Sequence, residues 1–201
     1  MTSYEHYESV LDNAPFDHES FTVLVARGVD QAAVAAALRI DTTVTPGSDW
    51  DAVDERTAYA LADLPNGVVA VELTGYGDPS LRALEELTRD GGSAGVVRSN
   101  IQAHYRFGCA RDGRVLFDDD EYTWVDDHDR VPEELRELFL AAWDDPDDES
   151  DDAEDHALAI GLAMCEVITG VQLTAEHLHQ AMANGFRPAP SLTYVGGDSD
   201  E

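Results

Sequence analysis

The chain has 201 residues, 43% of them apolar, which suits one domain with a substantial buried core. Its 42 acidic residues face only 12 basic ones, all of them arginines, so the formal net charge at neutral pH is −30. Because such a charge repels polyphosphates and anionic headgroups, we expect no direct binding to nucleic acid and no membrane association.

The first forty residues predict three elements. Apolar residues at helical spacing predict a short helix over 4–11, and the β-branched run FTVLVARG predicts a strand over 21–28. Asp30 follows, placed as the N-cap of an alanine-rich helix. Residues 41–55 have turn-forming composition and little periodicity, so we expect a loop there.

Residues 57–92 predict a hairpin followed by a helix. Two apolar runs flank Asn66-Gly67, a dipeptide that readily adopts the positive φ angles of a tight turn. Asp78 and Pro79 stand at the preferred places of an N-cap and a first helical residue, so we expect the helix to begin there.

A further strand over 93–102 and a second hairpin, with its turn at Asp112-Gly113, complete the predicted sheet. The first six strands and helices from residue 21 onward follow the βαββαβ order of a ferredoxin-like sandwich. We therefore expect an α+β fold with a mostly antiparallel sheet, extra strands and helices packed on one face. This is an analogy of element order and implies no function.

The C-terminal third is predicted to be helical. The segment 131–143 has an apolar stripe at helical spacing, and a second, almost entirely apolar helix is expected over 155–169. Nine of the twelve residues 144–155 are acidic, which is typical of a solvated linker. The expected organisation is an α/β sandwich core over 1–143, an acidic linker over 144–155, C-terminal helices packed on the core over 156–186, and a flexible tail over 187–201.

Cysteine usage and hydropathy indicate a cytoplasmic protein. Cys109 and Cys165 are the only cysteines and lie far apart in the sequence, so we expect two buried free thiols, as in a reducing compartment. The first residues lack the basic and apolar regions of a signal peptide. The longest apolar run, 157–165, is far shorter than the ~20 residues of a membrane span.

The chain also resembles an uncharacterised family of small soluble proteins from high-GC bacteria, known as a domain of unknown function. The resemblance rests on FTVLVARGVD, on NIQAHYRFGCARDG (100–113) and on ALAIGLAMCEVITGVQLTAEHL (157–178). The residues that fit the family motifs are Asn100, Ala103, Arg106, Phe107, Asp112, Gly113, Gly170, Val171, Leu173 and Thr174, with Ile168 replacing a leucine. The chain departs from the family in lacking a tryptophan in its first hairpin and in its long acidic insert. The resemblance implies a fold and brings no catalytic activity.

Arg98, Asn100, His104 and Arg106 are a candidate ligand-binding set. Strand alternation places Arg98 with Asn100, and His104 with Arg106, while Cys109 points away from His104, which argues against a nucleophilic pair. Arginine presents a planar fork to carboxylates and phosphates, so the set could take a small anion. The alternative is a structural network in which the arginines pair with nearby carboxylates.

The acidic segment 118–129 is a candidate partner-binding site. Aromatic side chains ringed by carboxylates resemble the hot spots of protein interfaces. The alternative is that Trp124 tucks under the sheet while the carboxylates stay hydrated. The candidate residues are Asp118, Asp119, Asp120, Glu121, Tyr122 and Trp124.

The sequence predicts no metal site and no cofactor. His177 and His179 diverge on a helix, and the segment 118–129 lacks the central glycine and final glutamate of a calcium loop. The segment GYGDPS (75–80) lacks the third glycine of a dinucleotide-binding loop.

We therefore expect a non-enzymatic, acidic cytoplasmic protein that binds a protein partner, basic in charge, in an immunity-like or regulatory role. One alternative is a small-molecule or anion binder, or an enzyme, that uses the Arg/Asn/His face. Another is a mimic of the DNA phosphate backbone. The acidity is also explained, without any function, by a high-GC genome or a salty cytoplasm.

Overall fold

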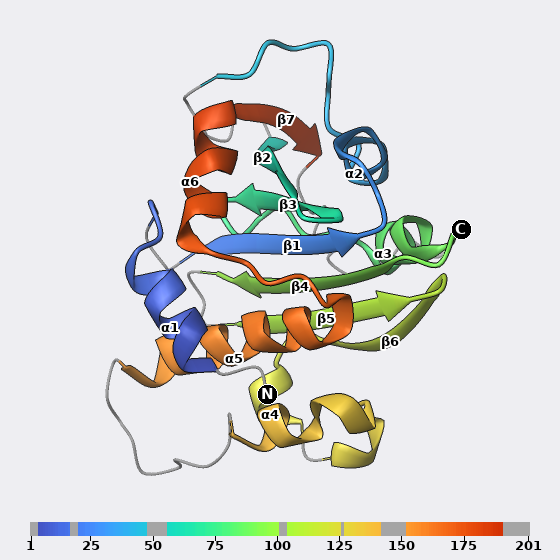
Figure 1. Ribbon diagram of the computed structural model, residues 1–201, viewed down its shortest axis with the longest axis vertical. Helices are drawn as coiled ribbons and strands as arrows, with labels where there is room; N and C mark the ends of the chain where they lie inside the picture. Colours follow the sequence, from blue (N-terminus) through green and yellow to red (C-terminus); the bar gives the residue numbers. More distant parts are fainter. Residues whose placement is uncertain are drawn as a thin grey trace, which may run out of the picture.

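A computed structural model describes residues 4–16, 20–47, 56–100, 104–125, 127–141 and 152–190, and it confirms the α+β class. Seven strands form one antiparallel sheet in the order β6-β5-β4-β1-β3-β2-β7 (Figure 1). The strands are β1 (Phe21–Arg27), β2 (Arg56–Leu64), β3 (Gly67–Glu72), β4 (Ser93–Ser99), β5 (Tyr105–Arg111), β6 (Arg114–Asp119) and β7 (Phe186–Pro190).

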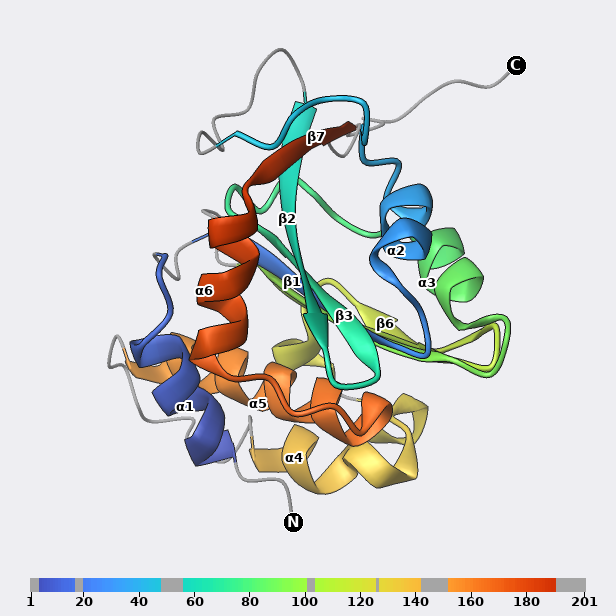
Figure 2. The same cartoon turned by 45° about the horizontal axis from the view of Figure 1, so that its top comes forward.

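Helices cover both faces of this sheet (Figure 2). The α-helices are α1 (Tyr4–Asp12), α2 (Gln31–Ala37), α3 (Leu81–Thr88), α4 (Arg136–Ala141), α5 (Asp152–Thr169) and α6 (Ala175–Asn184), and the short 3-10 helices are η1 (Tyr122–Trp124), η2 (His128–Arg130) and η3 (Glu133–Leu135). Helices α2 and α3 bury one face, whereas α1, α4, α5 and α6 bury the other.

The expectation that the helices share one face was therefore wrong for the sheet as a whole. It holds only for the two helices of the βαββαβ segment, whose strands lie in the order β4-β1-β3-β2. Strands β3 and β4 are buried along their whole length, and a strand without a polar side needs cover on both faces. The C-terminal helices and α1 supply the second cover.

Both expected hairpins are present. Asn66 has a φ of 71° at the turn between β2 and β3, and Asp112 and Gly113 have φ values of 52° and 72° between β5 and β6. These are the left-handed conformations that Asn, Asp and Gly tolerate best, which is why the turns could be located from the sequence.

The start of α3 differs from the expectation. Ser80, not Asp78, is the N-cap, and its hydroxyl accepts a hydrogen bond from the Ala83 N–H at 3.2 Å. Asp78 instead forms ion pairs with two buried arginines. These ion pairs stabilise the fold more than an N-cap by Asp78 would, because Ser80 caps the helix equally well.

The C-terminal end of the described chain is a strand. Residues 187–190, expected to belong to a flexible tail, continue β7, which pairs antiparallel with β2 at the sheet edge. Two prolines in five residues argue against a strand except at an edge, where a missing N–H is tolerated. Residues 191–201, and most of the expected acidic linker, lie outside the described residues. Within the described ranges, no helix combines the length and apolar composition needed to cross a bilayer.

Candidate functional site

A row of polar side chains crosses the sheet on the face that α2 and α3 cover. Thr22 of β1 lies directly opposite Glu72 of β3 on one side and opposite Arg98 of β4 on the other. Arg98 in turn lies opposite Arg106 of β5. None of the four is more than 5% exposed. We call these four residues the polar row. Charged side chains this deeply buried require specific partners.

The two arginines of the polar row share one carboxylate. Asp78 Oδ2 lies 3.4 Å from Arg98 Nη1, and Asp78 Oδ1 contacts Arg106 Nη1. Each arginine also has a second carboxylate partner. Asp118 Oδ1 accepts from Arg106 Nε at 2.8 Å and lies 2.7 Å from Arg106 Nη2. Asp120 Oδ1 lies 3.1 Å from Arg98 Nη2. Three carboxylates thus surround two guanidinium groups, so this is no free cationic patch.

Two glycines allow the charged groups to approach the sheet. A Cβ at Gly108 would lie 2.5 Å from Asp118 Oδ1, and a Cβ at Gly77 would lie 2.7 Å from both Glu72 Cγ and the Tyr59 hydroxyl. Gly77 belongs to residues 74–80, which connect β3 to α3 and which we call the cover segment. Gly77 of GYGDPS therefore allows close packing against Glu72 of the polar row.

Thr57, Thr74 and the backbone of Gly77 surround the Glu72 carboxylate. Its Oε1 accepts hydrogen bonds from the Thr57 and Thr74 hydroxyls and from the Thr74 N–H at 2.8 Å. Burial raises the pKa of Glu72, and these hydrogen bonds oppose the rise. Burial, followed by the carboxylates of Glu72 and Asp78, also raises the pKa of the Tyr59 hydroxyl.

Three buried side-chain atoms lack a hydrogen-bond partner in the described part of the chain: Thr22 Oγ1, Glu72 Oε2 and Arg98 Nε. All three belong to neighbouring members of the polar row. Buried polar atoms are almost always paired, so their concentration at one place distinguishes this region from the rest of the core.

The raised pKa of Glu72 predicts a pH dependence of stability. A protonated Glu72 favours the folded state at low pH, and this contribution is lost as the pH rises through the folded-state pKa. We expect Glu72→Gln, which stays neutral, to gain stability over wild type as the pH rises from about 4.3, the ordinary glutamic acid value, toward neutrality. Urea denaturation over that range measures the difference. The exposed Glu137→Gln should track wild type, and a constant difference for Glu72→Gln would contradict the prediction.

The other two residues of the expected ligand-binding set lie outside the polar row. Asn100 follows β4, and its Oδ1 accepts from the His104 N–H at 3.3 Å. His104 Nδ1 lies 2.8 Å from Glu121 Oε1, with 39% of its side chain exposed. The structure therefore brings Arg98 and Arg106 together, and places Asn100 and His104 in the connection between β4 and β5.

Thr22, Glu72 and Asp78 were not predicted as site residues. A signal was available for two of them, because Thr22 and Glu72 interrupt the apolar runs FTVLVA and GVVAVE. No local pattern distinguishes Asp78 from a helix cap.

The acidic segment divides into buried and exposed parts. Tyr122 is fully buried, and its hydroxyl donates to the Ala157 carbonyl, whereas Trp124 is 74% exposed and does not tuck under the sheet. Asp119 Oδ1 accepts from the Glu121 N–H at 3.0 Å, and its Oδ2 lies 3.7 Å from Arg130 Nη1. Like Asp118 and Asp120, these acidic residues have partners within the chain.

The two thiols are free and buried. Burial raises the pKa of Cys109 to about 12 and also raises that of Cys165. Both are therefore protonated at neutral pH and are poor nucleophiles. Among the described residues, no group of three or more His, Cys, Asp or Glu side chains is arranged to hold a metal ion.

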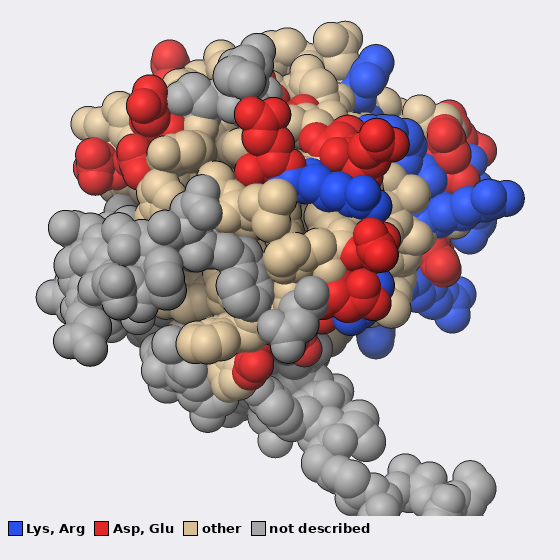
Figure 3. Space-filling model, turned by 90° about the horizontal axis from the view of Figure 1, so that it is seen from below, with Lys and Arg blue, Asp and Glu red and all other residues tan. Residues whose placement is uncertain are grey.

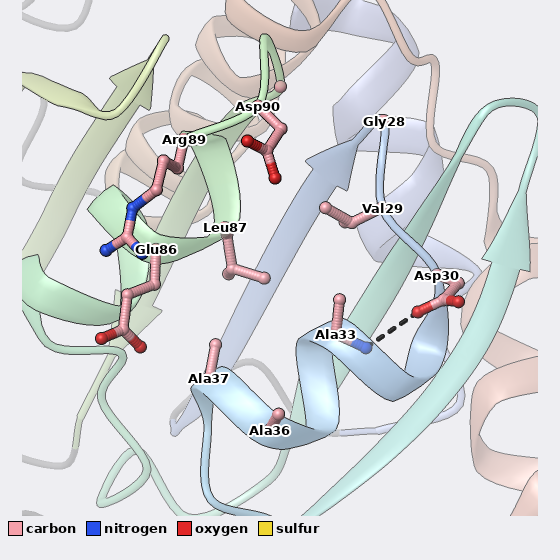
Figure 4. Close-up of a pocket in the computed structure, with 11 residues that line it drawn as sticks. Gly28, Val29, Asp30, Ala33, Ala36, Ala37, Glu86, Leu87, Arg89 and Asp90 are labelled. Carbon is pink, nitrogen blue, oxygen red and sulfur yellow. Dashed lines mark hydrogen bonds between the residues drawn. The ribbon is translucent and has the colours of Figure 1, made fainter.

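A cavity of about 490 Å³ lies between α2 and α3 (Figure 4). Val29, Ala33 and Leu87 point into it. Of the acidic residues at its rim, Asp30 accepts from the Ala33 N–H at 2.8 Å, and Glu86 pairs with Arg82 at 2.9 Å. Arg89 and Asp90 also line the cavity, so its lining combines small apolar side chains with charged ones from α2 and α3.

Comparison with known proteins identifies one family. Residues 12–186 match the model of a family described as Family of unknown function (DUF6461), which confirms the resemblance to a domain of unknown function. No similar curated protein and no similar solved structure was found.

Proposed function

We propose that this chain, which belongs to the family of unknown function DUF6461, is a non-enzymatic protein that presents Trp124 to a basic protein partner. The observation that carries the proposal is the 74% exposure of Trp124. The proposal includes an immunity-like or regulatory role in the cytoplasm of a high-GC bacterium. It is supported by the excess of acidic residues and by the use of arginine for every basic residue.

Trp124 is held outward by its neighbours. Tyr122 and Val125, on either side of it, belong to the main core cluster, and the backbone N–H of Trp124 donates to the Glu121 carbonyl at 2.8 Å. Because this backbone is already held in place, a partner that covers Trp124 has only the side chain to order. Tryptophan is also enriched among the residues that dominate interface energies.

The charge around Trp124 favours a basic partner. Glu121 and Asp129 have 53% and 97% of their side chains exposed, and carboxylates at an interface rim steer an oppositely charged protein toward it. Figure 3 shows arginines interleaved with acidic residues on one side of the lower face of the molecule, and acidic residues without them on the other. On this face the mixture of charges does not form the continuous acidic row that a mimic of the DNA phosphate backbone requires.

Trp124→Ala is expected to weaken partner binding at least about thirty-fold, since hot-spot truncations cost about 2 kcal/mol or more. Tagged wild-type protein, Trp124→Ala and Tyr76→Ala would be used to capture proteins from the native host at moderate salt. Tyr76 is a matched control, because it is an aromatic residue with 46% exposure in the cover segment. A basic protein that wild type and Tyr76→Ala retain, and Trp124→Ala loses, supports the proposal. If wild type and both variants retain the same basic protein, the proposal is contradicted.

The alternative of an anion binder that uses Arg98, Asn100, His104 and Arg106 has less support. The carboxylates of Asp78, Asp118 and Asp120 already compensate the charge of the two arginines. An added anion would have to displace one of them.

A further inference from the structure

The cavity between α2 and α3 owes its size to small side chains (Figure 4). Helix α2 reads QAAVAAA, and Ala33, Ala36 and Ala37 line the cavity, whereas Val34 is buried in the core. Leu87 of α3 lines it as well. Because alanine side chains are too short to fill the space between the helices, about 490 Å³ stays open. Pockets for small organic molecules commonly measure about 300–1,000 Å³, so the cavity is large enough to hold one.

Two chain connections meet at one end of the cavity, namely the connection from β1 to α2 and the one from α3 to β4. A Cβ at Gly28 would lie 3.5 Å from Gly92 Cα, so the two connections are in van der Waals contact. Asp30 and Asp90 each lie two residues from this contact, and both line the cavity. This end of the cavity therefore carries two carboxylates.

Neither carboxylate is neutralised by a described residue. Asp30 Oδ1 accepts the N-cap hydrogen bond from the Ala33 N–H at 2.8 Å, which leaves Asp30 Oδ2 available. Asp90 forms no hydrogen bond or ion pair within the part of the chain that the structure describes. Both carboxylates can therefore accept hydrogen bonds from a ligand.

The charges on the other side of the cavity include both signs. Figure 4 shows Arg89 beside Glu86, on the side of Leu87 that is away from Asp30. Glu86 itself pairs with Arg82 at 2.9 Å. The excess of negative charge is therefore at the end where the two connections meet. A ligand cation is attracted to that end, and a ligand anion is repelled from it.

We propose that this cavity is a binding site for a small amphipathic cation, a primary amine with a short alkyl chain. The alkyl chain packs between the alanines of α2 and Leu87. The ammonium group lies between Asp30 and Asp90 and donates hydrogen bonds to both, since an ammonium group has several N–H donors. The site does not involve Trp124, so it does not depend on the proposed partner binding.

The test uses n-butylammonium as the probe, with butyrate as the anionic control and n-butanol as the neutral control. We expect n-butylammonium, titrated into the full chain at moderate salt, to shift the backbone amide resonances of Val29, Ala33 and Leu87 saturably. Butyrate should leave these resonances unchanged. The alcohol lacks the charge, so it should bind about three- to fivefold more weakly than the amine.

Substitutions locate the bound amine. Ala33→Leu fills the cavity from an exposed position of a helix, where leucine is well tolerated, so it should abolish binding and leave the fold intact. Its control is Ala32→Leu, at an exposed neighbour outside the cavity lining, which should bind as wild type does. Asp90→Asn should weaken binding about three- to fivefold, and so should Asp30→Asn, because asparagine keeps the N-cap and removes only the charge. Glu85→Gln, exposed on α3 and outside the lining, should have no effect.

Other outcomes overturn the proposal. If n-butylammonium produces no saturable shift, the cavity is no amine site. Equal binding of n-butanol would show that the carboxylates take no part, and equal binding of butyrate would show that Arg89 selects the ligand instead. If Ala33→Leu binds the amine as wild type does, the probe lies elsewhere on the acidic surface.

Discussion

Replacing Asp78 by alanine is expected to lower the free energy of unfolding by about 3–5 kcal/mol, because it removes the shared partner of two buried guanidinium groups. Arg98 and Arg106 are 5% and 3% exposed, and Asp78 is the only described residue that contacts both in an ion pair. Their outer partners, Asp118 and Asp120, cannot replace a carboxylate between them. Urea denaturation at neutral pH measures the loss.

The matched control is Asp129→Ala. Asp129 has 97% of its side chain exposed and lies 3.9 Å from Arg136 Nη2, so its removal should change stability by less than about 0.5 kcal/mol. If Asp78→Ala costs no more than this control, the polar row is not held together by the ion pairs described. Recovery of stability in Asp78→Ala combined with Arg106→Met would show that the unpaired charge causes the loss.

Gly95→Ala is expected to destabilise the fold by about 1–3 kcal/mol, because β4 and α5 are in contact at this glycine. A Cβ at Gly95 would lie 2.7 Å from Cys165 Sγ, 3.0 Å from its Cα and 3.1 Å from its Cβ. The Cα belongs to the helix backbone, so the clash is relieved only if α5 moves away from the sheet. Thermal or urea unfolding measures the loss.

A double-mutant cycle with Cys165→Ala tests the cause of this loss. Removing Sγ deletes the shortest contact but leaves those to Cα and Cβ, so the double variant should recover part of the loss caused by Gly95→Ala. Strict additivity of the two substitutions would indicate that α5 does not rest on Gly95.

Local features of the sequence determined the α+β class, most helices and both hairpins. Asn66 and Asp112 sit in turns that need positive φ angles, and only a few residue types adopt these readily. Asp30 caps α2 as expected, since an N-cap bond forms within four residues. The apolar runs of β1 and β3 indicate strands because their β-branched composition is a property of each segment alone.

The tertiary structure decided the roles that depend on distant partners. Asp78 has the sequence context of a helix cap, yet two arginines from β4 and β5 make it the centre of an ion-pair cluster. The prolines of β7 are tolerated because β7 pairs only with β2 and forms the edge of the sheet, where a missing N–H leaves no strand unpaired. Thr22, Glu72 and Arg98 lie far apart in the chain, and strand order and register alone make them neighbours. A turn or a cap is formed by adjacent residues, whereas the polar row exists only once the sheet has assembled.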